Sequence, residues 1–205
     1  ADGLADHFAV CDVTDEAAVL RTVEQLSEHQ PIDIVIANAG HAETAPIGRC
    51  DTAMFHRMLA LNLGGTVTAF RAALPAMHAR KSGRLIAIAS TAGLRGYAFA
   101  SAYAASKHAV VGLVRSLSLE LARSGITVNA VCPGYTETDL VASGAAAIAA
   151  KRGISLEEAK ASFANDNPMG RLILPEEVAD MVAWLCGDTT ASITGQAMLI
   201  NGGEF

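Results

Sequence analysis

Aromatic and charged side chains are both scarce in this chain, at 5% and 18% of its 205 residues. Lysine and arginine form no cluster and the formal net charge is −6, so a surface that binds nucleic acid is not expected. Apolar runs nowhere approach the roughly 18 to 20 residues of a membrane span, and the first residues do not form a signal peptide. The composition therefore predicts a globular protein that has neither a nucleic-acid partner nor a membrane partner.

Cysteine pairs and metal-ligand spacings are also lacking. The four cysteines are scattered without a CxxC pair, and the six histidines form no cluster. Free buried thiols in a reducing compartment are the simplest interpretation of this pattern. We therefore expect a cytoplasmic protein without a metal site.

What the chain does contain is an alternation of short β-rich runs and longer helical patterns, which is typical of a parallel sheet with crossover helices. The expected strands cover residues 7–12, 32–40, 83–90, 126–134 and 196–202, and the expected helices cover 14–29, 51–80, 101–123 and 176–186. The sequence thus predicts one α/β domain over residues 1–205. Its doubly wound, Rossmann-like parallel sheet should lie between two helical layers.

Residues 135–174 interrupt this alternation. They hold Ala-rich and charged helical pieces that are expected to break at Gly144, Gly153 and Pro168. Open α/β folds bind ligands beyond the carboxyl ends of their strands, and this insertion should lie there. We expect it to form a helical lid whose apolar residues favour an apolar or mixed substrate over a sugar.

One helix carries a lysine on the face that should be buried. Tyr103 and Lys107 are four residues apart, on the line that Val110, Val114 and Leu117 continue. A buried ammonium group is costly unless it is paired or its pKa is shifted. For an isolated YxxxK motif, which is common, a structural lysine is the simpler interpretation. The surroundings of the motif decide between the two.

Two further polar residues occupy comparable positions. Ser90 ends a predicted strand thirteen residues before Tyr103, where α/β folds build their sites. Asn62 interrupts the apolar face of the 51–80 helix, and each glycine of the Gly64-Gly65 pair that follows weakens this helix by about 1 kcal/mol. A local kink that frees backbone groups near Asn62 would account for this pattern.

With these residues in place, the sequence resembles the short-chain dehydrogenase/reductase family, classical type, over essentially all 205 residues. Each matching motif is weak alone, but their order and spacing together are highly specific. The motifs are CDVTD (11–15), ANAG (37–40), LNLGG (61–65), IAIAS (86–90), YAASK (103–107), NAVCPGYTET (129–138) and GQAMLINGG (195–203).

The resemblance implies four catalytic residues: Asn62, Ser90, Tyr103 and Lys107. Tyr103 would exchange a proton with the substrate oxygen, to which Ser90 would hydrogen-bond. Lys107 would favour the phenolate and hold the nicotinamide ribose, and Asn62 would hold a water molecule in a proton relay. A phenol with a pKa of about 10 is a poor base at neutral pH, and a pKa of roughly 7 requires about 4 kcal/mol of differential stabilisation. We expect the Lys107 ammonium group to supply it.

The resemblance also implies a site for NAD or NADP. Asp12 would accept a hydrogen bond from the adenine amino group, although a helix N-cap is the alternative interpretation of this residue. One segment, 38–40, would pass close to the adenosine ribose, and the loop at 133–138 would grip the nicotinamide amide. The implied cofactor-binding residues are Asp12, Val13, Asn38, Ala39, Gly40, Tyr103, Lys107, Pro133, Gly134 and Thr138.

The family's glycine-rich phosphate turn, TGxxxGxG after the first strand, does not occur in the sequence. The chain begins just before what resembles the third strand in an expected sheet order of 3-2-1-4-5-6-7. We expect roughly fifty residues with the first two strands to precede it, because strand 4 would otherwise present an apolar edge. The residues that choose between NAD and NADP belong to that segment.

The implied function is that of an NAD(P)(H)-dependent oxidoreductase that interconverts a secondary alcohol and a ketone. The stretch NPMGRLILPEEVA (167–179) is similar to members that act on 3-oxoacyl or 3-hydroxyacyl compounds. Two alternatives stay open: a catalytically silent scaffold or regulatory protein with the same fold, and an epimerase or dehydratase of the extended relatives. The apolar faces of helices 51–80 and 101–123 favour a homotetramer, with a dimer as the alternative.

Overall fold

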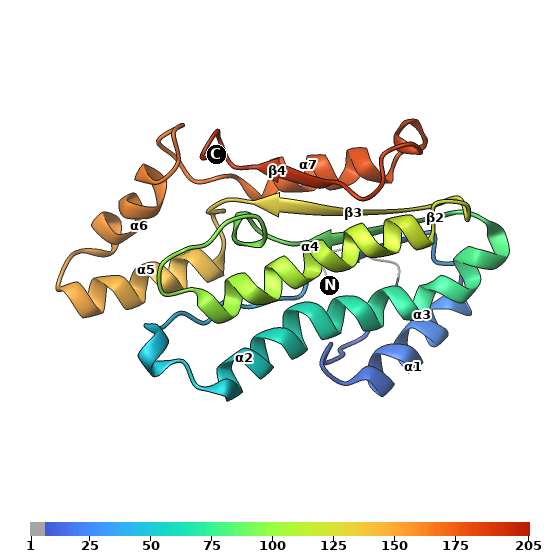
Figure 1. Cartoon of the computed structure of the whole chain (residues 1–205), viewed down its shortest axis with the longest axis horizontal. Helices are drawn as coiled ribbons and strands as arrows, with labels where there is room; N and C mark the ends of the chain where they lie inside the picture. Colours follow the sequence, from blue (N-terminus) through green and yellow to red (C-terminus); the bar gives the residue numbers. More distant parts are fainter. Residues whose placement is uncertain (1–6) are drawn as a thin grey trace.

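Four parallel strands form the centre of the structure, a computed structural model that describes residues 7–205 (Figure 1). The strands are β1 (Ile34–Ala37), β2 (Gly83–Ile88), β3 (Ile126–Pro133) and β4 (Ala197–Ile200), and they lie in the order β1-β2-β3-β4. Leu85 of β2 pairs with Val35 on one side and with Val128 on the other. Seven of the eight residues of β3 are buried, as expected of a central strand that is covered on both faces.

Helices cover both faces of this sheet. They are α1 (Glu16–Ser27), α2 (Thr52–Leu59), α3 (Gly65–Arg80), α4 (Ser101–Glu120), α5 (Asp139–Arg152), α6 (Leu156–Asn165) and α7 (Pro175–Cys186). One core joins Phe70 of α3 and Val114 of α4 to Leu85 and Val128. On the opposite face, Leu185 of α7 packs with neighbouring strand residues such as Ile86. The doubly wound α/β architecture predicted from the sequence is confirmed.

The strand expected at 7–12 is absent, and this prediction was wrong. These residues adopt no regular structure, and the side chains of Phe8 and Val10 are 75% and 99% exposed. A strand is stabilised by backbone hydrogen bonds to a neighbour. Within residues 7–205, no strand pairs with this segment, and the outer edge of β1 is likewise unpaired.

The helix expected at 51–80 is divided into two by a π-helical turn, Ala60–Gly64. α2 ends before this turn and α3 begins after it, so the regular helix is interrupted near Asn62, where the sequence predicted a kink. A π turn inserts an extra residue into the helical ladder and frees backbone groups there. The Asn62 carbonyl uses this freedom to accept a hydrogen bond from Thr66 Oγ1 at 2.8 Å.

Residues 135–174 form α5 and α6 with the loops around them. Gly153 has a positive φ of 66° and ends α5 as predicted. Gly144 was expected to end a helix but lies inside α5, so this prediction was wrong. A Cβ atom at this position would lie 3.5 Å from Phe163 Cζ of α6, which is an ordinary van der Waals contact between the two helices.

Over residues 7–205, every helix is too short or too polar to cross a membrane. In the same range, His, Cys, Asp and Glu side chains nowhere gather in the groups of three that a metal ion would require. The first six residues of the expected domain, 1–6, lie outside the described part of the chain.

Candidate active site

The predicted catalytic residues meet at one edge of the sheet. Ser90 lies two residues beyond β2, while Tyr103 and Lys107 lie in the first turns of α4. Asn62 lies in the π turn, and its side chain bonds to Ser106 of α4. Because the strands are parallel, their carboxyl ends bring these segments together. Asn62, Ser90, Tyr103 and Lys107 are called the polar cluster below.

Lys107 is buried, as the sequence predicted, with 5% of its surface exposed. Its Nζ donates a hydrogen bond to the Ile88 carbonyl oxygen at 2.8 Å and lies 6.0 Å from the centroid of the Tyr103 ring. Burial lowers the pKa of Lys107 from its ordinary 10.5 to about 8. The ammonium group has three hydrogens. Only one is used by Ile88, so the other two can reach a ligand.

The Tyr103 hydroxyl lies within reach of Ser90. Burial raises the pKa of Tyr103, and a hydrogen bond from the Ser90 side chain opposes this rise. The expectation that Lys107 would bring the pKa of Tyr103 down to neutrality is therefore wrong for this structure. The ammonium group points to Ile88, and loss of water around the phenol is the larger effect.

Asn62 is 1% exposed, and its amide is almost fully hydrogen-bonded. Nδ2 donates to the His41 carbonyl at 3.0 Å and to Ser106 Oγ at 2.9 Å, while Oδ1 accepts from the His41 N–H at 3.0 Å. The side chain thus ties the loop after β1 to α4. That Asn62 holds a water molecule stays a prediction. Such a water molecule would use the acceptor capacity that remains on Oδ1.

Gly40 lets the loop after β1 approach the polar cluster. A Cβ atom at this position would lie 2.8 Å from Asn62 Oδ1 and 3.4 Å from Lys107 Nζ. The first distance is shorter than a real Cβ contact, so only glycine fits without displacement. Asn38, Ala39 and Gly40 lie directly after β1, and Gly40 is exposed. The uncovered backbone beside Lys107 fits the predicted approach of a dinucleotide ribose.

Asp12 and Val13 lie in the loop before α1. Asp12 Oδ1 accepts hydrogen bonds from the Thr14 N–H and from Thr14 Oγ1, both at 2.8 Å, and these bonds lower the pKa of the carboxyl group. The cap of α1 is Asp15, which accepts from the Ala18 N–H, so the N-cap interpretation of Asp12 is wrong. An exposed, ionised Asp12 fits the predicted acceptor for an adenine amino group.

The third predicted cofactor segment follows β3. The Gly134 N–H donates to the Ile200 carbonyl at 3.0 Å, which fixes this loop against β4. Thr138 is exposed beside a hollow of about 210 Å³, whose other lining includes Val141 of α5, Lys160 of α6 and Leu172. The hollow shares no lining residue with the polar cluster. Thr138 therefore lies at the border between the proposed cofactor loop and the 135–174 segment.

Several residues of this edge were not expected from the sequence. Ser106 supports Asn62, and the buried thiol of Cys132 approaches Ser90 and Lys107, with a pKa that burial raises to about 11. Position 106, between Tyr103 and Lys107 in the YAASK motif, could have indicated the first of these roles.

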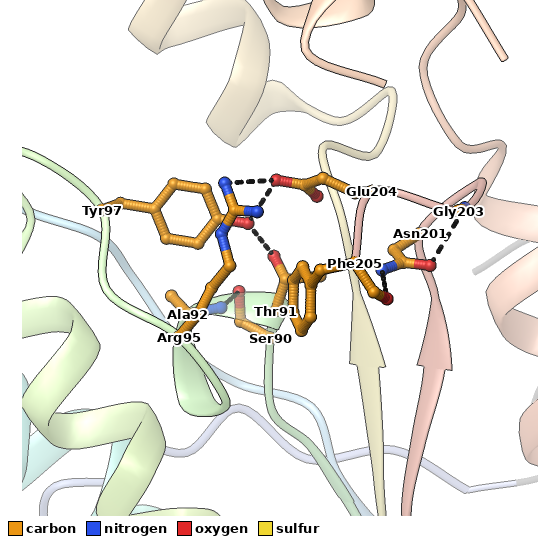
Figure 2. A network of polar contacts seen from close by, with 9 residues as sticks. All are labelled: Ser90, Thr91, Ala92, Arg95, Tyr97, Asn201, Gly203, Glu204 and Phe205. Atoms are coloured by element: carbon orange, nitrogen blue, oxygen red, sulfur yellow. Dashed lines mark hydrogen bonds and ion pairs between the residues drawn. The ribbon is translucent and has the colours of Figure 1, made fainter. Parts of the chain in front are cut away.

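A polar network next to Ser90 consists of Thr91, Arg95, Tyr97 and Glu204 (Figure 2). Contacts between residues 91–97 and residue 204 have no signature in a single sequence.

Known proteins resemble this chain over nearly all its length. The protein-family model described as enoyl-(acyl carrier protein) reductase matches residues 1–204. A protein of Streptomyces virginiae assigned as the monensin polyketide synthase ketoacyl reductase is 38% identical over 205 residues, covering 98% of this chain and 78% of the relative. A D-beta-hydroxybutyrate dehydrogenase of Rhizobium meliloti is 38% identical over 172 residues, covering 83% of this chain and 67% of the relative.

Among solved structures, a single-substitution variant of the actinorhodin polyketide ketoreductase with NADPH has a TM-score of 0.91 and 38% sequence identity. The match covers 96% of this chain and 76% of the ketoreductase. The fold and the relatives agree with the expectations drawn from the sequence. The chain therefore belongs to the short-chain dehydrogenase/reductase family and is an NAD(P)-dependent oxidoreductase that acts on alcohols and ketones.

Proposed function

We propose that this oxidoreductase reduces the ketone of a 3-oxoacyl-type substrate, with Tyr103 as the proton donor. The observation that carries the proposal is the juxtaposition of Tyr103 with the Ser90 hydroxyl, one helical turn from the buried Lys107. Two hydroxyl groups at one point can both hydrogen-bond the same carbonyl oxygen. Such a pair polarises the carbonyl group and stabilises the negative charge that develops on its oxygen.

The protonation state of the Tyr103 phenol suits the role of a proton donor. Burial raises the pKa of Tyr103, so the hydroxyl group is protonated at neutral pH and can donate its proton to a forming alkoxide. Ser90 donates a hydrogen bond that stabilises the phenolate left behind. Lys107, with a pKa of about 8, adds a positive charge below that pH. These states allow Tyr103 to act as the proton donor in ketone reduction near neutral pH.

A bound nicotinamide supplies the hydride in this chemistry. We assign its ribose to Lys107 and Tyr103, and its amide to the loop of Pro133, Gly134 and Thr138. Asp12, the Val13 backbone and the segment 38–40 would hold the adenosine half. Asn62 keeps that segment in place through both hydrogen bonds to His41, and it is also our candidate for the residue that holds a water molecule of the proton relay.

The segment 135–174 is our candidate for the substrate lid of a single domain. Apolar side chains lie beside the hollow at Thr138, among them Val141 of α5 and Leu172. Their character suits an acyl chain. Two relatives, assigned as a ketoacyl reductase and a D-beta-hydroxybutyrate dehydrogenase, support a substrate with an oxygen at carbon 3.

We further propose a cytoplasmic homotetramer. The four cysteines, all within the described residues, are free thiols, which suits a reducing compartment. Leu119 of α4 is 81% exposed and Trp184 of α7 is 47% exposed. Exposed large apolar side chains on helices of both sheet faces suit two different contacts between subunits. Analytical ultracentrifugation of the purified protein measures the number of subunits.

The test is a turnover assay with the intact protein, following loss of absorbance of reduced nicotinamide. The substrates are a 3-oxoacyl thioester, a matched trans-2-enoyl thioester and a simple ketone, each with NADH and with NADPH. We expect turnover of the 3-oxoacyl thioester. Turnover of the enoyl thioester alone would overturn the proposed carbonyl chemistry. If no substrate turns over and neither dinucleotide binds in calorimetry, the proposal is likewise wrong.

A further inference from the structure

A buried carboxylate lies beside the loop that carries Ser90 (Figure 2). The side chain of Glu204, four residues beyond β4, is 7% exposed. Its Oε1 accepts a hydrogen bond from Tyr97 Oη at 2.7 Å and pairs with Arg95 Nη2 at 3.2 Å. A buried carboxylate without such partners would be strongly unfavourable. Both partners come from the loop between β2 and α4, so Glu204 joins the segment after β4 to the Ser90 loop.

A chain of hydrogen bonds continues from this carboxylate towards Ser90. Tyr97 Oη also lies 2.8 Å from Thr91 Oγ1. A phenol has one hydrogen, which goes to the carboxylate, so the Thr91 hydroxyl donates to Tyr97. Burial raises the pKa of Tyr97, which keeps the phenol protonated. Thr91 is 4% exposed and directly follows Ser90 in the chain.

Ser90 itself is held by the turn that Thr91 begins. The Ser90 hydroxyl oxygen accepts a hydrogen bond from the Ala92 N–H at 3.1 Å and caps the short 3-10 helix Thr91–Gly93. The position of this turn therefore sets the direction of the Ser90 side chain. Tyr97 and Glu204 hold the turn through the Thr91 hydroxyl.

Arg95 packs over the same loop. Its guanidinium carbon lies 4.7 Å from the centroid of the Tyr97 ring and 4.9 Å from that of the Phe205 ring. The two rings and the carboxylate together hold the Arg95 side chain, which stays 41% exposed. Glu204 Oε2 also borders Gly134, where a Cβ atom would lie 3.5 Å away. The carboxylate thus lies between the Ser90 loop and the loop after β3.

We propose that Glu204 is a positioning residue for the reaction: through Tyr97 and Thr91 it fixes the turn that directs the Ser90 hydroxyl to the substrate oxygen. This inference rests on the proposed role of Ser90. A positioning role differs from that of a purely structural ion pair, because the effect of Glu204 on the rate would depend on the Ser90 hydroxyl group.

The test compares Glu204→Ala and Glu204→Gln with Glu177→Gln as the matched control. Glu177 forms a two-point ion pair with Arg171, at 2.7 Å for each oxygen, and contacts neither Thr91 nor Tyr97. We expect Glu204→Ala to lower kcat about tenfold with little change in the KM for the dinucleotide. Glu204→Gln keeps an acceptor for Tyr97 and should recover part of the loss. The control should keep its kcat.

The decisive measurement repeats Glu204→Ala in a Ser90→Ala background. If Glu204 acts through Ser90, the second substitution lowers kcat no further. An equal loss of about tenfold in both backgrounds would overturn the proposal, since Glu204 would then act independently of Ser90. Should Glu204→Ala fail to fold, Tyr97→Phe replaces it, because this variant breaks the link to Thr91 and leaves the Arg95–Glu204 pair intact.

A readout that needs no turnover separates this proposal from the proposed function. Carbon-13 labelling of tyrosine allows the Tyr103 phenol to be titrated by NMR, with Tyr103→Phe assigning the signal. Because Ser90 lowers the pKa of Tyr103, Glu204→Ala and Ser90→Ala should both raise it, and Glu177→Gln should not. No rise in Glu204→Ala would overturn the positioning role even in a protein that turns over no substrate tested.

Discussion

The polar cluster and the segment 135–174 face the same edge of the sheet, but they are built differently. α4, which carries Tyr103 and Lys107, buries eight of its twenty residues, whereas α5 and α6 bury one residue each, Ala145 and Ala159. Reactive groups need a rigid framework, and a surface that accommodates substrates can be loosely packed. The comparison predicts that changes in the cluster affect the rate, and that changes in 135–174 affect substrate affinity.

The largest effect is expected for Tyr103→Phe, which removes one hydroxyl group from the cluster. Loss of a general acid typically slows a reaction by about a hundredfold to ten-thousandfold, and we expect about a thousandfold loss of kcat. Circular dichroism should show an unchanged fold, because the ring remains. A loss of less than about tenfold would contradict the role of Tyr103 as the proton donor. It would also contradict the prediction that changes in the polar cluster affect the rate.

The buried charge of Lys107 should appear in the pH dependence of stability. Its pKa is about 8 in the folded protein and near 10.5 when exposed, so between these values the unfolded chain binds the proton more tightly. The free energy of unfolding should therefore rise with pH over this window. At about 1.36 kcal/mol for each pH unit, this residue contributes a rise of about 3 kcal/mol.

Urea unfolding at a series of pH values across the window from about 8 to 10.5 measures this rise. Lys107→Met has no group that titrates there, so its stability should follow pH without the Lys107 contribution. Parallel curves for the two proteins would mean that Lys107 is not desolvated. The polar cluster would then be more open to water than the burial of α4 indicates.

Gly40→Ala should damage the site without removing any reactive group. The added Cβ atom would lie 2.8 Å from Asn62 Oδ1, so the loop after β1 or the Asn62 amide must move. A displacement of about 1 Å in a catalytic arrangement can lower the rate about a hundredfold. Gly48→Ala is the matched control, because nothing lies within 4 Å of its added Cβ atom. Equal activity of the two variants would show that the cluster tolerates movement.

The smallest effect is expected in the 135–174 segment. The Phe163 ring of α6 lies 4.8 Å from that of Tyr135 and supports the helix pair at Gly144. Loss of this aromatic pair should loosen α6 against the loop after β3. Phe163→Ala should therefore raise the substrate KM by about threefold to tenfold and leave kcat within about twofold. Leu156→Ala, at an exposed position of the same helix, should leave both constants unchanged. A change of kcat alone in Phe163→Ala would contradict the prediction that the 135–174 segment affects substrate affinity and not the rate.

The parts of the site that could be predicted from the sequence are those in which one segment carries the information. The YAASK stretch placed a lysine on a buried helical face, and the structure buries it. Asn62 and the glycines after it indicated a kink, which appears as the π turn. The strand order β1-β2-β3-β4 agrees with the expected 4-5-6-7 half of the sheet.

The errors share a different cause, because each depends on a neighbour from another part of the chain. Residues 7–12 have the composition of a strand but no pairing partner within residues 7–205. Gly144 has the sequence context of a helix breaker, but α5 continues through it and packs there against Phe163 of the next helix. The pKa of Tyr103 depends on desolvation, which a spacing of four residues to Lys107 does not reveal. The Glu204 network joins residues that are 107 positions apart in the chain.

The π turn at Ala60–Gly64 has a consequence for protein engineering. A π turn holds one residue more than the α-helix around it, so removing one residue here would join α2 and α3 into a continuous α-helix. Phe70 and Met77 would keep their places in the core, whereas Asn62 would lose the turn that directs its amide to His41. A single-residue deletion at this point should therefore preserve the fold and damage the site. The extra residue serves the position of Asn62 and not the packing of the helix.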